Sequence, residues 1–356
     1  MQDSLSEPNF FLSSLLDKLK RHPKRVVFPE AEDIRVLRVA AELVRQEAAL
    51  PILLGNRATL KAMANDHGIP TTFINFIDPS TSSDLPLFCD RFTRMEGFRG
   101  IKVLNPEETL VKPHYFASMM VQYGQADAVV AGNLVYPTEV YRPLLHLIKP
   151  LPEVPAPFGA VILVDDREPS AERVLILADC SLHVSPSTDQ LAAMAVECGK
   201  LARHILGRKA KIAMLSHSTK GSSASPSSRK MAAATALARE TILAHAYDLE
   251  IEGEVQADAA LVPAIADKKN PASFVHGDAD VLIFPTLDAS DIAVRLLRHL
   301  AGFKTYGQLV LGLARPAAQV PRGASTDHIL GSALAVAVEA VKYHEIYPQG
   351  DSGSGW

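Results

Sequence analysis

The sequence predicts an α/β protein built on a parallel sheet that helices cover on both sides. Three observations support this prediction. Short apolar runs recur along the chain, helical patterns follow most of them, and most of the runs are apolar on both faces. Strands that are apolar on both faces are typical of parallel sheets, because the crossover helices bury both sides. The expected strands lie at 25–28, 51–54, 128–130, 211–215 and 281–284.

Helical patterns lie between these runs. IRVLRVAAELVRQEA follows the first run, and TLKAMANDHG follows the second. Ser187 and Gln190 form a capping-box pattern, which predicts the start of a long helix that ends at Gly207.

One stretch departs from this alternation. The runs at 160–166 and 173–179 leave no room for a helix between them, and residues 165–170 have the composition of a hairpin loop. An antiparallel hairpin inside a parallel α/β chain indicates a domain junction. The proline-rich stretch 150–157 just before it has the composition of a linker.

The composition excludes several classes of protein. Of 356 residues, 47% are apolar and 21% are charged, and the formal net charge is −4. These values exclude a collagen-like, low-complexity or disordered chain. The mild negative charge argues against nucleic acid or a membrane surface as the main partner, although local basic residues can hold small anions. The length predicts two domains.

Disulfide, metal and membrane sites are not expected. Cys89, Cys180 and Cys198 are too few and too scattered for a disulfide framework or a zinc knuckle, and no histidines have the spacing of a zinc helix. The acidic N-terminus is not a signal peptide, and no apolar run approaches the about 18 residues that a membrane helix needs. We therefore expect a cytoplasmic protein, with a flexible GDSGSGW tail.

A polar loop at 216–225 is the first candidate site. It lies between the apolar run KIAML and a helical pattern, and it combines hydroxyls, a glycine and Lys220. Backbone N–H groups, hydroxyls and a lysine at a strand-to-helix turn predict a phosphate cradle. The alternative is a flexible polar loop, since the Walker A pattern is absent.

The second candidate is PRGASTDH at 321–328. Arg322 beside Gly323 can approach an oxyanion closely, and Ser325 can cap the last helix, whose start would also attract an anion. His328 would lie in the first turn, where the helix dipole favours the neutral imidazole that can accept a proton. The alternative is a surface cap with a solvated histidine.

The third candidate, GNLVYPTEVYRP at 132–143, follows the run at 128–130. Loops after strand ends line the ligand crevice of an open α/β sheet. Arg142 is therefore a further anion candidate, with a surface salt bridge as the alternative. Three such turns after strands in one chain are a stronger signal than any one of them.

These segments together resemble the phosphate acetyltransferase and phosphate butyryltransferase family. The matching stretches run in family order over residues 24–345, and they include VVFPEAEDIRVLRVA, ADAVVAGN, AMLSHSTKG, VLIFPTLDASDI and PRGASTDHI. The third and fourth of these stretches are specific to the family.

The resemblance implies an architecture. It is the two-domain, open parallel-sheet fold of phosphotransacetylases, which is similar to that of isocitrate and isopropylmalate dehydrogenases. Domain one would contain residues 1–152 and 313–356, and domain two residues 153–312. The active site would lie in the cleft between the domains, and the usual assembly would be a homodimer.

The resemblance also implies a reaction, in which acyl phosphate and coenzyme A give acyl-CoA and phosphate. The thiol attacks the acyl carbon directly. No metal and no tightly bound cofactor are expected, and the partners are the small substrates alone: acyl phosphate, phosphate and coenzyme A.

Site residues follow from the same resemblance. Catalytic roles are expected for Arg142, Arg322, Asp327 and His328. Substrate-binding positions are Arg94, Asn133, Tyr136, Ser216, Ser218, Thr219, Lys220, Gly221, Ser222, Gly323 and Ser325. Coenzyme A-binding positions are Asp288, Asp291, Arg298 and His299.

Several family residues are replaced in this sequence. In the family motif S-R-G-x-S-x-x-D-I, the serine is Pro321, and the aspartate that is the proposed thiol base is His328. Asn133 replaces an alanine, His183 an asparagine, and His299 an arginine that helps to bind coenzyme A.

Three functions are compatible with these replacements. The first is an active phosphate acyltransferase in which His328 or Asp327 is the base. The second is an acyltransferase that uses another acyl donor or thiol. The third is a non-catalytic sensor of acyl-CoA or acyl phosphate, because the same fold occurs as a regulatory domain. We expect the first.

Overall fold

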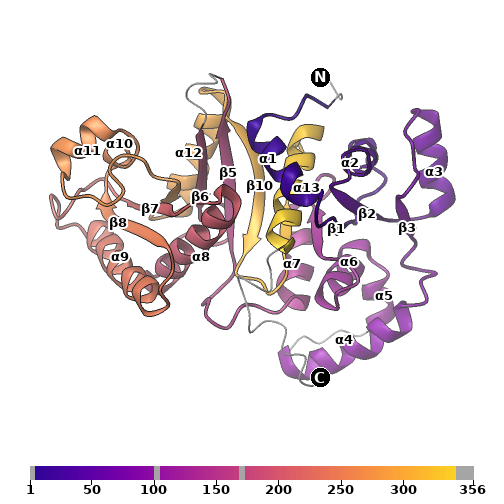
Figure 1. The fold of residues 1–356 in the computed structure, drawn as a ribbon. Helices are drawn as coiled ribbons and strands as arrows, with labels where there is room; N and C mark the ends of the chain where they lie inside the picture. The colour runs from indigo at the N-terminus through magenta and orange to yellow at the C-terminus, as the bar shows by residue number, and fades with distance from the viewer. Residues whose placement is uncertain (1–4, 100–104, 168–172, 342–356) are drawn as a thin grey trace. The chain divides into compact units, whose positions relative to one another are not determined.

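A computed structural model describes residues 5–99, 105–167 and 173–341. Part of the expected hairpin loop at 165–170 and the whole GDSGSGW tail lie outside these residues. The chain groups into two compact units, which we call unit 1 (residues 1–150 and 313–356) and unit 2 (residues 151–312). Figure 1 shows the helices and strands of each unit.

Unit 1 contains a parallel sheet in the order β3-β2-β1-β4-β11. Its strands are β1 (Lys24–Phe28), β2 (Ala49–Leu54), β3 (Asn75–Ile77), β4 (Ala128–Ala131) and β11 (Ala317–Gln319). Its helices are α1 (Phe10–Leu19), α2 (Ile34–Arg45), α3 (Arg57–Asp66), α4 (Leu85–Arg99), α5 (Pro106–Leu110), α6 (Pro113–Gln122), α7 (Pro137–Leu147) and α13 (Thr326–Val341).

The core of unit 1 lies on both faces of this sheet. Val26, Val27 and Phe28 are buried in succession, as expected for a strand with helices on both sides. Helices α1, α2 and α13 lie on one face, and α6 and α7 lie on the other (Figure 1). Helix α13 is apolar around nearly its whole circumference and is buried accordingly.

Unit 2 contains a mixed sheet in the order β10-β5-β6-β9-β7-β8. Strand β5 runs antiparallel to its two neighbours, β10 and β6, and all the other neighbouring strands are parallel to each other. Its strands are β5 (Phe158–Asp165), β6 (Arg173–Ala178), β7 (Ala210–Leu215), β8 (Leu249–Val255), β9 (Val281–Ile283) and β10 (Lys304–Leu311). Its helices are α8 (Thr188–Leu206), α9 (Pro226–Ala244), α10 (Ala257–Leu261), α11 (Pro263–Lys269) and α12 (Leu287–His299).

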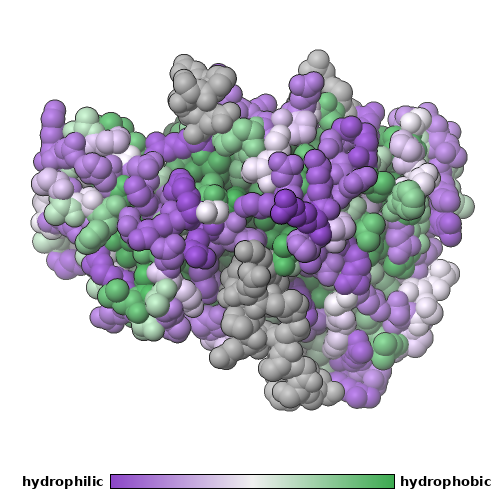
Figure 2. All heavy atoms as spheres, in the orientation of Figure 1, coloured by the Kyte–Doolittle hydropathy of each residue, from purple (hydrophilic) through white to green (hydrophobic). Residues whose placement is uncertain are grey.

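Both faces of the unit 2 sheet are covered. Leu163, Leu177, Ala213 and Leu282 form one buried layer, which α10, α11 and α12 cover. Helices α8 and α9 pack side by side on the other face (Figure 1). Hydrophilic residues cover much of the visible surface of both units, with apolar side chains scattered between them (Figure 2).

The local predictions agree with these elements. Each expected strand is present within two residues of its predicted start, and β5 and β6 form the expected antiparallel pair. Ser187 and Gln190 form the capping box of α8, which ends at Gly207 in the left-handed conformation. No helix in the part of the chain that the structure describes is long and apolar enough to cross a membrane.

One strand that sequence reasoning missed is β8. Its sequence, LEIEGEV, contains three glutamates and therefore has a polar pattern. Glu252 and Glu254 are nevertheless buried, with 2% and 4% of their surface exposed. Buried carboxylates need partners, and each of these two has a partner in the loop that follows β7.

Candidate active site

Three loops of unit 1 meet at one edge of its sheet. Strand β4 lies between β1 and β11, and all three are parallel. The carboxyl ends of parallel neighbours meet at the same edge, where α/β proteins place their ligands. Residues 29–33 follow β1, residues 132–136 follow β4, and residues 320–325 follow β11. The structure thus brings together two of the three candidate segments.

Glu30 holds the loop after β4 in place. Its carboxylate accepts hydrogen bonds from the backbone N–H groups of Gly132 (2.8 Å) and Leu134 (2.7 Å), and it contacts His114 Nε2 at 2.7 Å. Gly132 has φ +114°, and a Cβ there would lie 2.4 Å from the carbonyl oxygen of Val320. Only glycine fits at this close approach of two loops.

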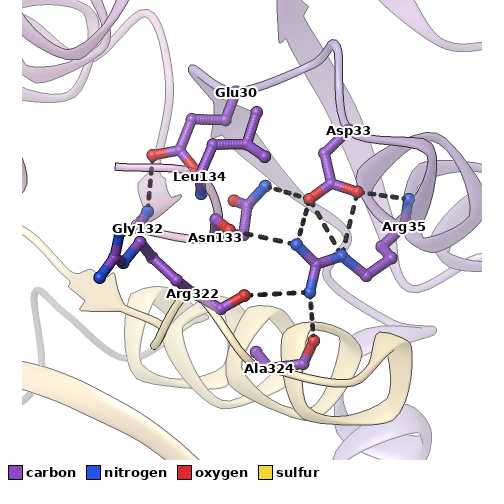
Figure 3. A network of polar contacts seen from close by, with 8 residues as sticks. All are labelled: Glu30, Asp33, Arg35, Gly132, Asn133, Leu134, Arg322 and Ala324. Carbon is purple, nitrogen blue, oxygen red and sulfur yellow. Dashed lines mark hydrogen bonds and ion pairs between the residues drawn. The ribbon is translucent and has the colours of Figure 1, made fainter. Parts of the chain in front are cut away.

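Asp33, in the loop after β1, is the centre of a second cluster of polar contacts at the same edge of the sheet (Figure 3). It caps α2 by accepting from the backbone N–H of Arg35 (2.9 Å), and it forms an ion pair with the Arg35 guanidinium (2.5 Å). Buried Asn133 donates from Nδ2 to Asp33 at 2.9 Å. Burial acts to raise the pKa of Asp33, but the hydrogen bonds from Arg35 and Asn133 outweigh it and hold the pKa below its ordinary value.

Arg35 also joins the two neighbouring loops. Its guanidinium donates to the carbonyl oxygen of Asn133 (3.1 Å) in the loop after β4. It donates as well to the carbonyl oxygens of Arg322 (3.3 Å) and Ala324 (2.6 Å) in the turn after β11. Figure 3 shows this guanidinium between the loops.

The side chain of Arg322 is exposed and stacks on Tyr136. Its guanidinium carbon lies 4.1 Å from the ring centroid, and 59% of Tyr136 is exposed. A Cβ added at the neighbouring Gly323 would meet no atom within 4 Å, so the space beside Arg322 is open. Arg142 is exposed on α7. It lies close enough to Tyr115 for its charge to oppose the rise that burial causes in the pKa of that phenol.

The start of α13 holds the two candidate bases. Ser325 Oγ accepts the backbone N–H of His328 at 3.2 Å, as a capping residue does. The alternative of a solvated His328 is wrong, because only 5% of this residue is exposed. Asp327 is more accessible, but its carboxylate accepts from the backbone N–H (2.9 Å) and the hydroxyl (2.5 Å) of Ser6.

The side chain of Arg94 has its ion pair within α4. Its side chain is 70% exposed on α4, and it pairs with Asp90 one turn earlier at 2.8 Å. This is the surface salt bridge that is the ordinary state of an exposed arginine.

The polar loop of unit 2 is held by hydrogen bonds within its own unit. Every backbone N–H from Ser218 to Ser223 donates a hydrogen bond within the unit. The carboxylate of Glu254 accepts from Gly221 N–H (2.7 Å) and from Ser218 Oγ (2.9 Å). Lys220 pairs with buried Glu252 at 2.5 Å.

Binding of an anion by these N–H groups and Lys220 stays a prediction, and in this structure the groups have partners within unit 2 instead. Gly221 N–H and Lys220 pair with carboxylates of β8, and the other N–H groups donate to hydroxyl and carbonyl oxygens. Of the other loop residues predicted to bind substrate, Thr219 is buried, Ser216 is half-buried and Ser222 is exposed. The hydroxyl of Ser222 also accepts from the backbone N–H of Thr219 at 3.1 Å.

The four expected coenzyme A positions lie on α12. Asp288 and His299 are exposed, and Asp291 pairs with Arg295 at 2.7 Å. Burial and the nearby charge of Arg295 lower the pKa of Arg298. Asp288, Asp291 and Arg298 are spaced by multiples of a helical turn, so they share one face of α12.

Sequence reasoning did not single out Glu30, Asp33, Arg35 or Glu254. Three of these residues lie in FPEAEDIR, directly after a buried strand, and acidic residues at a strand end were the available signal. Glu254 gave no such signal, because it lies inside a strand. Among the described residues, no group of three or more His, Cys, Asp or Glu side chains could hold a metal ion.

Comparison with known proteins identifies the family. The family model described as phosphate acetyl/butaryl transferase matches residues 10–337, which is most of the chain. The chain belongs to the phosphate acetyl/butaryl transferase family. The predicted family is thus confirmed, and with it the expectation of an acyltransferase.

Members of the phosphate acetyl/butaryl transferase family match over nearly their whole length. A phosphate acetyltransferase of Acetivibrio thermocellus is 35% identical over 332 residues, which cover 93% of this chain and 98% of the relative. The solved phosphotransacetylase EutD of Staphylococcus aureus is 32% identical, covers 93% of this chain and 98% of its own, and superposes with a TM-score of 0.84. A phosphotransacetylase structure from Streptococcus pyogenes is 31% identical over the same shares, with a TM-score of 0.85. The predicted α/β fold class is confirmed.

Proposed function

We infer that this protein transfers an acetyl group reversibly between acetyl phosphate and coenzyme A. The observation that carries this inference is the exposed guanidinium of Arg322 at the carboxyl edge of the unit 1 sheet. It lies in a chain that matches a phosphate acetyltransferase over 93% of its length. Relatives named as enzymes do not favour the alternative of a regulatory sensor.

Arg322 and Arg142 are proposed to bind the phosphoryl group. Both are exposed, and the guanidinium fork matches the geometry of phosphate oxygens. Two cations also stabilise the charge that develops on the departing phosphate. Tyr136, Asn133, Gly323 and Ser325 line the proposed phosphoryl site, and Arg94 is a third cation whose role stays a prediction.

The proposed reaction is a direct displacement. A base accepts the thiol proton, because the thiolate is the nucleophile. The sulfur forms a bond to the acyl carbon, and the bond from that carbon to the phosphate oxygen breaks, so that phosphate departs. Asp327 and His328 are the candidate bases, and His328 must become more accessible than it is here to meet a thiol.

The two compact units are proposed to be the two domains of the enzyme. Unit 2 would contribute α12 to coenzyme A binding, with Arg298 as a cation for its phosphates and Asp288, Asp291 and His299 as polar contacts. Residues 216–222 would be the substrate loop, with Glu254 fixing its shape.

Two further parts of the proposal concern assembly and cofactors. The protein would act as a homodimer and would need no bound metal or cofactor, with coenzyme A as a substrate. Ile292 and Leu296 on α12 and Leu300 just after it form one exposed apolar row that pairing would cover. Light scattering after gel filtration would report the mass of the assembly.

A thiol assay tests the activity. Purified protein is mixed with acetyl phosphate and coenzyme A over a pH series, and loss of free thiol and release of phosphate are followed. Propionyl and butyryl phosphate are assayed beside it. Turnover that decreases on the acid side, near the ordinary histidine pKa of about 6.5, supports a histidine base. No turnover with any donor, together with binding of acyl-CoA, would establish the sensor instead.

A further inference from the structure

We propose that Arg35 is a positioning residue, which fixes the loop after β4 and the turn that carries Arg322 relative to each other. This proposal rests on the proposed function only in its last step, the binding of phosphate by Arg322. Arg35 itself would not touch the substrate.

The hydrogen bonds of Arg35 use all the donors of its guanidinium. The group has five N–H bonds. Nε–H donates to both carboxylate oxygens of Asp33, and one terminal nitrogen donates to Asp33 and to the carbonyl of Asn133. The other terminal nitrogen donates to the carbonyls of Arg322 and Ala324. No donor remains for a ligand, so Arg35 can act only through the groups it holds.

The turn after β11 depends on these bonds. Ala324 donates to the carbonyl of Pro321 at 2.8 Å, which closes the turn on itself. The side chain of Arg322 contacts the ring of Tyr136, which is itself exposed. The bonds from Arg35 to two carbonyls of this turn therefore anchor the backbone from which Arg322 projects.

The loop after β4 is held from both sides. Glu30 binds the N–H groups of Gly132 and Leu134, while Arg35 binds the carbonyl of Asn133 that lies between them. Asp33 binds both Arg35 and the Asn133 side chain. One arginine thereby ties the start of α2 to two loops that are 98 and 289 residues away in sequence.

The expected effect follows from the sensitivity of catalysis to geometry. A displacement of about 1 Å in a positioned group can lower the rate about 100-fold. Lysine keeps a positive charge beside Asp33, but a single ammonium cannot reach the carboxylate and three carbonyls of two loops. The Arg35→Lys substitution therefore removes the link between the loops without burying an unpaired carboxylate.

Arg25 offers a matched control in the same unit. It forms an ion pair with Asp127 (2.8 Å) and donates to the carbonyl of Gly124 (2.8 Å). Arg25 lies in β1 and Asp127 lies just before β4, so this pair joins the same two strands at their amino-terminal ends. Arg25→Lys thus perturbs an equivalent ion pair at the opposite edge of the sheet.

The experiment measures kcat and the two KM values for wild type, Arg35→Lys and Arg25→Lys, with thermal unfolding of each. We expect Arg35→Lys to lower kcat/KM for acetyl phosphate about 10- to 100-fold, with KM for coenzyme A unchanged. Arg25→Lys should lower the unfolding temperature and leave both KM values as in wild type. Equal kcat/KM for the two variants would overturn the proposal.

A double-mutant cycle separates positioning from general damage. If Arg35 acts through Arg322, then adding Arg35→Lys to Arg322→Ala should cause little further loss of kcat/KM. Fully additive losses would contradict the proposal.

Should Arg35→Lys fail to fold, Asp33→Asn serves in its place, because it keeps the shape of the side chain and removes the charge that orients the Arg35 guanidinium. Asp33→Asn should then lower kcat/KM for acetyl phosphate, but by less than Arg35→Lys would. An unchanged kcat/KM in Asp33→Asn would contradict the positioning role of Arg35.

Failure of the proposed function gives a different result. In that case wild-type protein does not turn over acetyl phosphate at all. Binding of inorganic phosphate, measured by calorimetry, then replaces kinetics. A weaker phosphate Kd in Arg35→Lys than in Arg25→Lys would still support positioning, and equal Kd values would overturn it.

Discussion

Unit 1 and unit 2 each contain a cation next to a loop that follows a buried strand, but the two cations are in opposite situations. In unit 1, the carbonyls around Arg322 are bound by Arg35, and the guanidinium of Arg322 contacts an exposed ring. In unit 2, Lys220 is paired with buried Glu252, and Glu254 binds the backbone N–H of Gly221. In unit 2, carboxylates of β8 thus take two of the contacts that the predicted phosphate would use.

The difference shows what makes a polar loop available to an anion. Composition decides which groups are present, and both loops have suitable groups. The neighbouring strand decides whether those groups are already satisfied. Four predictions test this contrast, in order of decreasing effect.

The start of α13 should give the largest effect. His328→Ala is expected to lower kcat about 10²- to 10⁴-fold if His328 is the thiol base, because general-base catalysis has that size. Steady-state kinetics and circular dichroism would show whether the loss occurs in a folded protein. Asp327→Asn is the matched variant. A normal rate in His328→Ala with a loss in Asp327→Asn would move the role to Asp327.

Arg322→Lys should impair the unit 1 site strongly. Loss of one donor to a developing anion costs about 10²- to 10³-fold in kcat, and lysine keeps the charge but loses the planar fork. Arg229, an exposed arginine at the start of α9, gives a control in Arg229→Lys. Unaltered kinetics in Arg322→Lys would refute the phosphate-binding role of Arg322.

Glu254→Gln should change stability and leave phosphate binding unaltered. The amide keeps the shape but weakens two charge-assisted hydrogen bonds to the loop, which is expected to cost about 1–3 kcal/mol. Urea unfolding measures this loss, and calorimetry measures the Kd for phosphate. If phosphate instead binds more tightly to Glu254→Gln, then the carboxylate occupies a genuine anion site and the contrast between the units fails.

Tyr136 should have the smallest effect. An exposed cation–π contact is worth about 0.5–1 kcal/mol, so Tyr136→Ser should raise KM for acetyl phosphate roughly 2- to 5-fold. Tyr136→Phe keeps the ring and should behave as wild type. The comparison of KM for acetyl phosphate in the two variants tests whether stacking on the ring orders Arg322. Equal values would show that the ring does not order Arg322.

Much of the local structure could be predicted from residues close together in sequence. The β1 run, the antiparallel β5–β6 pair and the capping box of α8 all follow from apolar periodicity or from pairs a few residues apart. Strand β8 could not be predicted in this way. Its glutamates give it the pattern of an exposed segment. They can be buried only because Lys220 and Ser218, more than 30 residues earlier in the chain, lie beside them in the fold.

The candidate site divides in the same way. The sequence was sufficient to identify the segments after β4 and β11 as anion-suited loops, because Arg, Gly and Ser after apolar runs are local signals. The burial of His328 depends on the elements that pack around α13, and the pairing of Asp327 depends on where the N-terminal segment places Ser6. Those contacts join residues that are 321 positions apart.

By itself, then, the sequence determined the α/β class, the bounds of α8, the start of α13, and the family, since each of these is encoded in residues that are neighbours along the chain. Only the tertiary structure decided which polar groups are satisfied. Arg35 and Lys220 both acquire their partners because the order of the strands brings those partners within hydrogen-bonding distance. A hydrogen bond is directional and acts over about 3 Å, so its partner cannot be assigned until the fold has placed both groups.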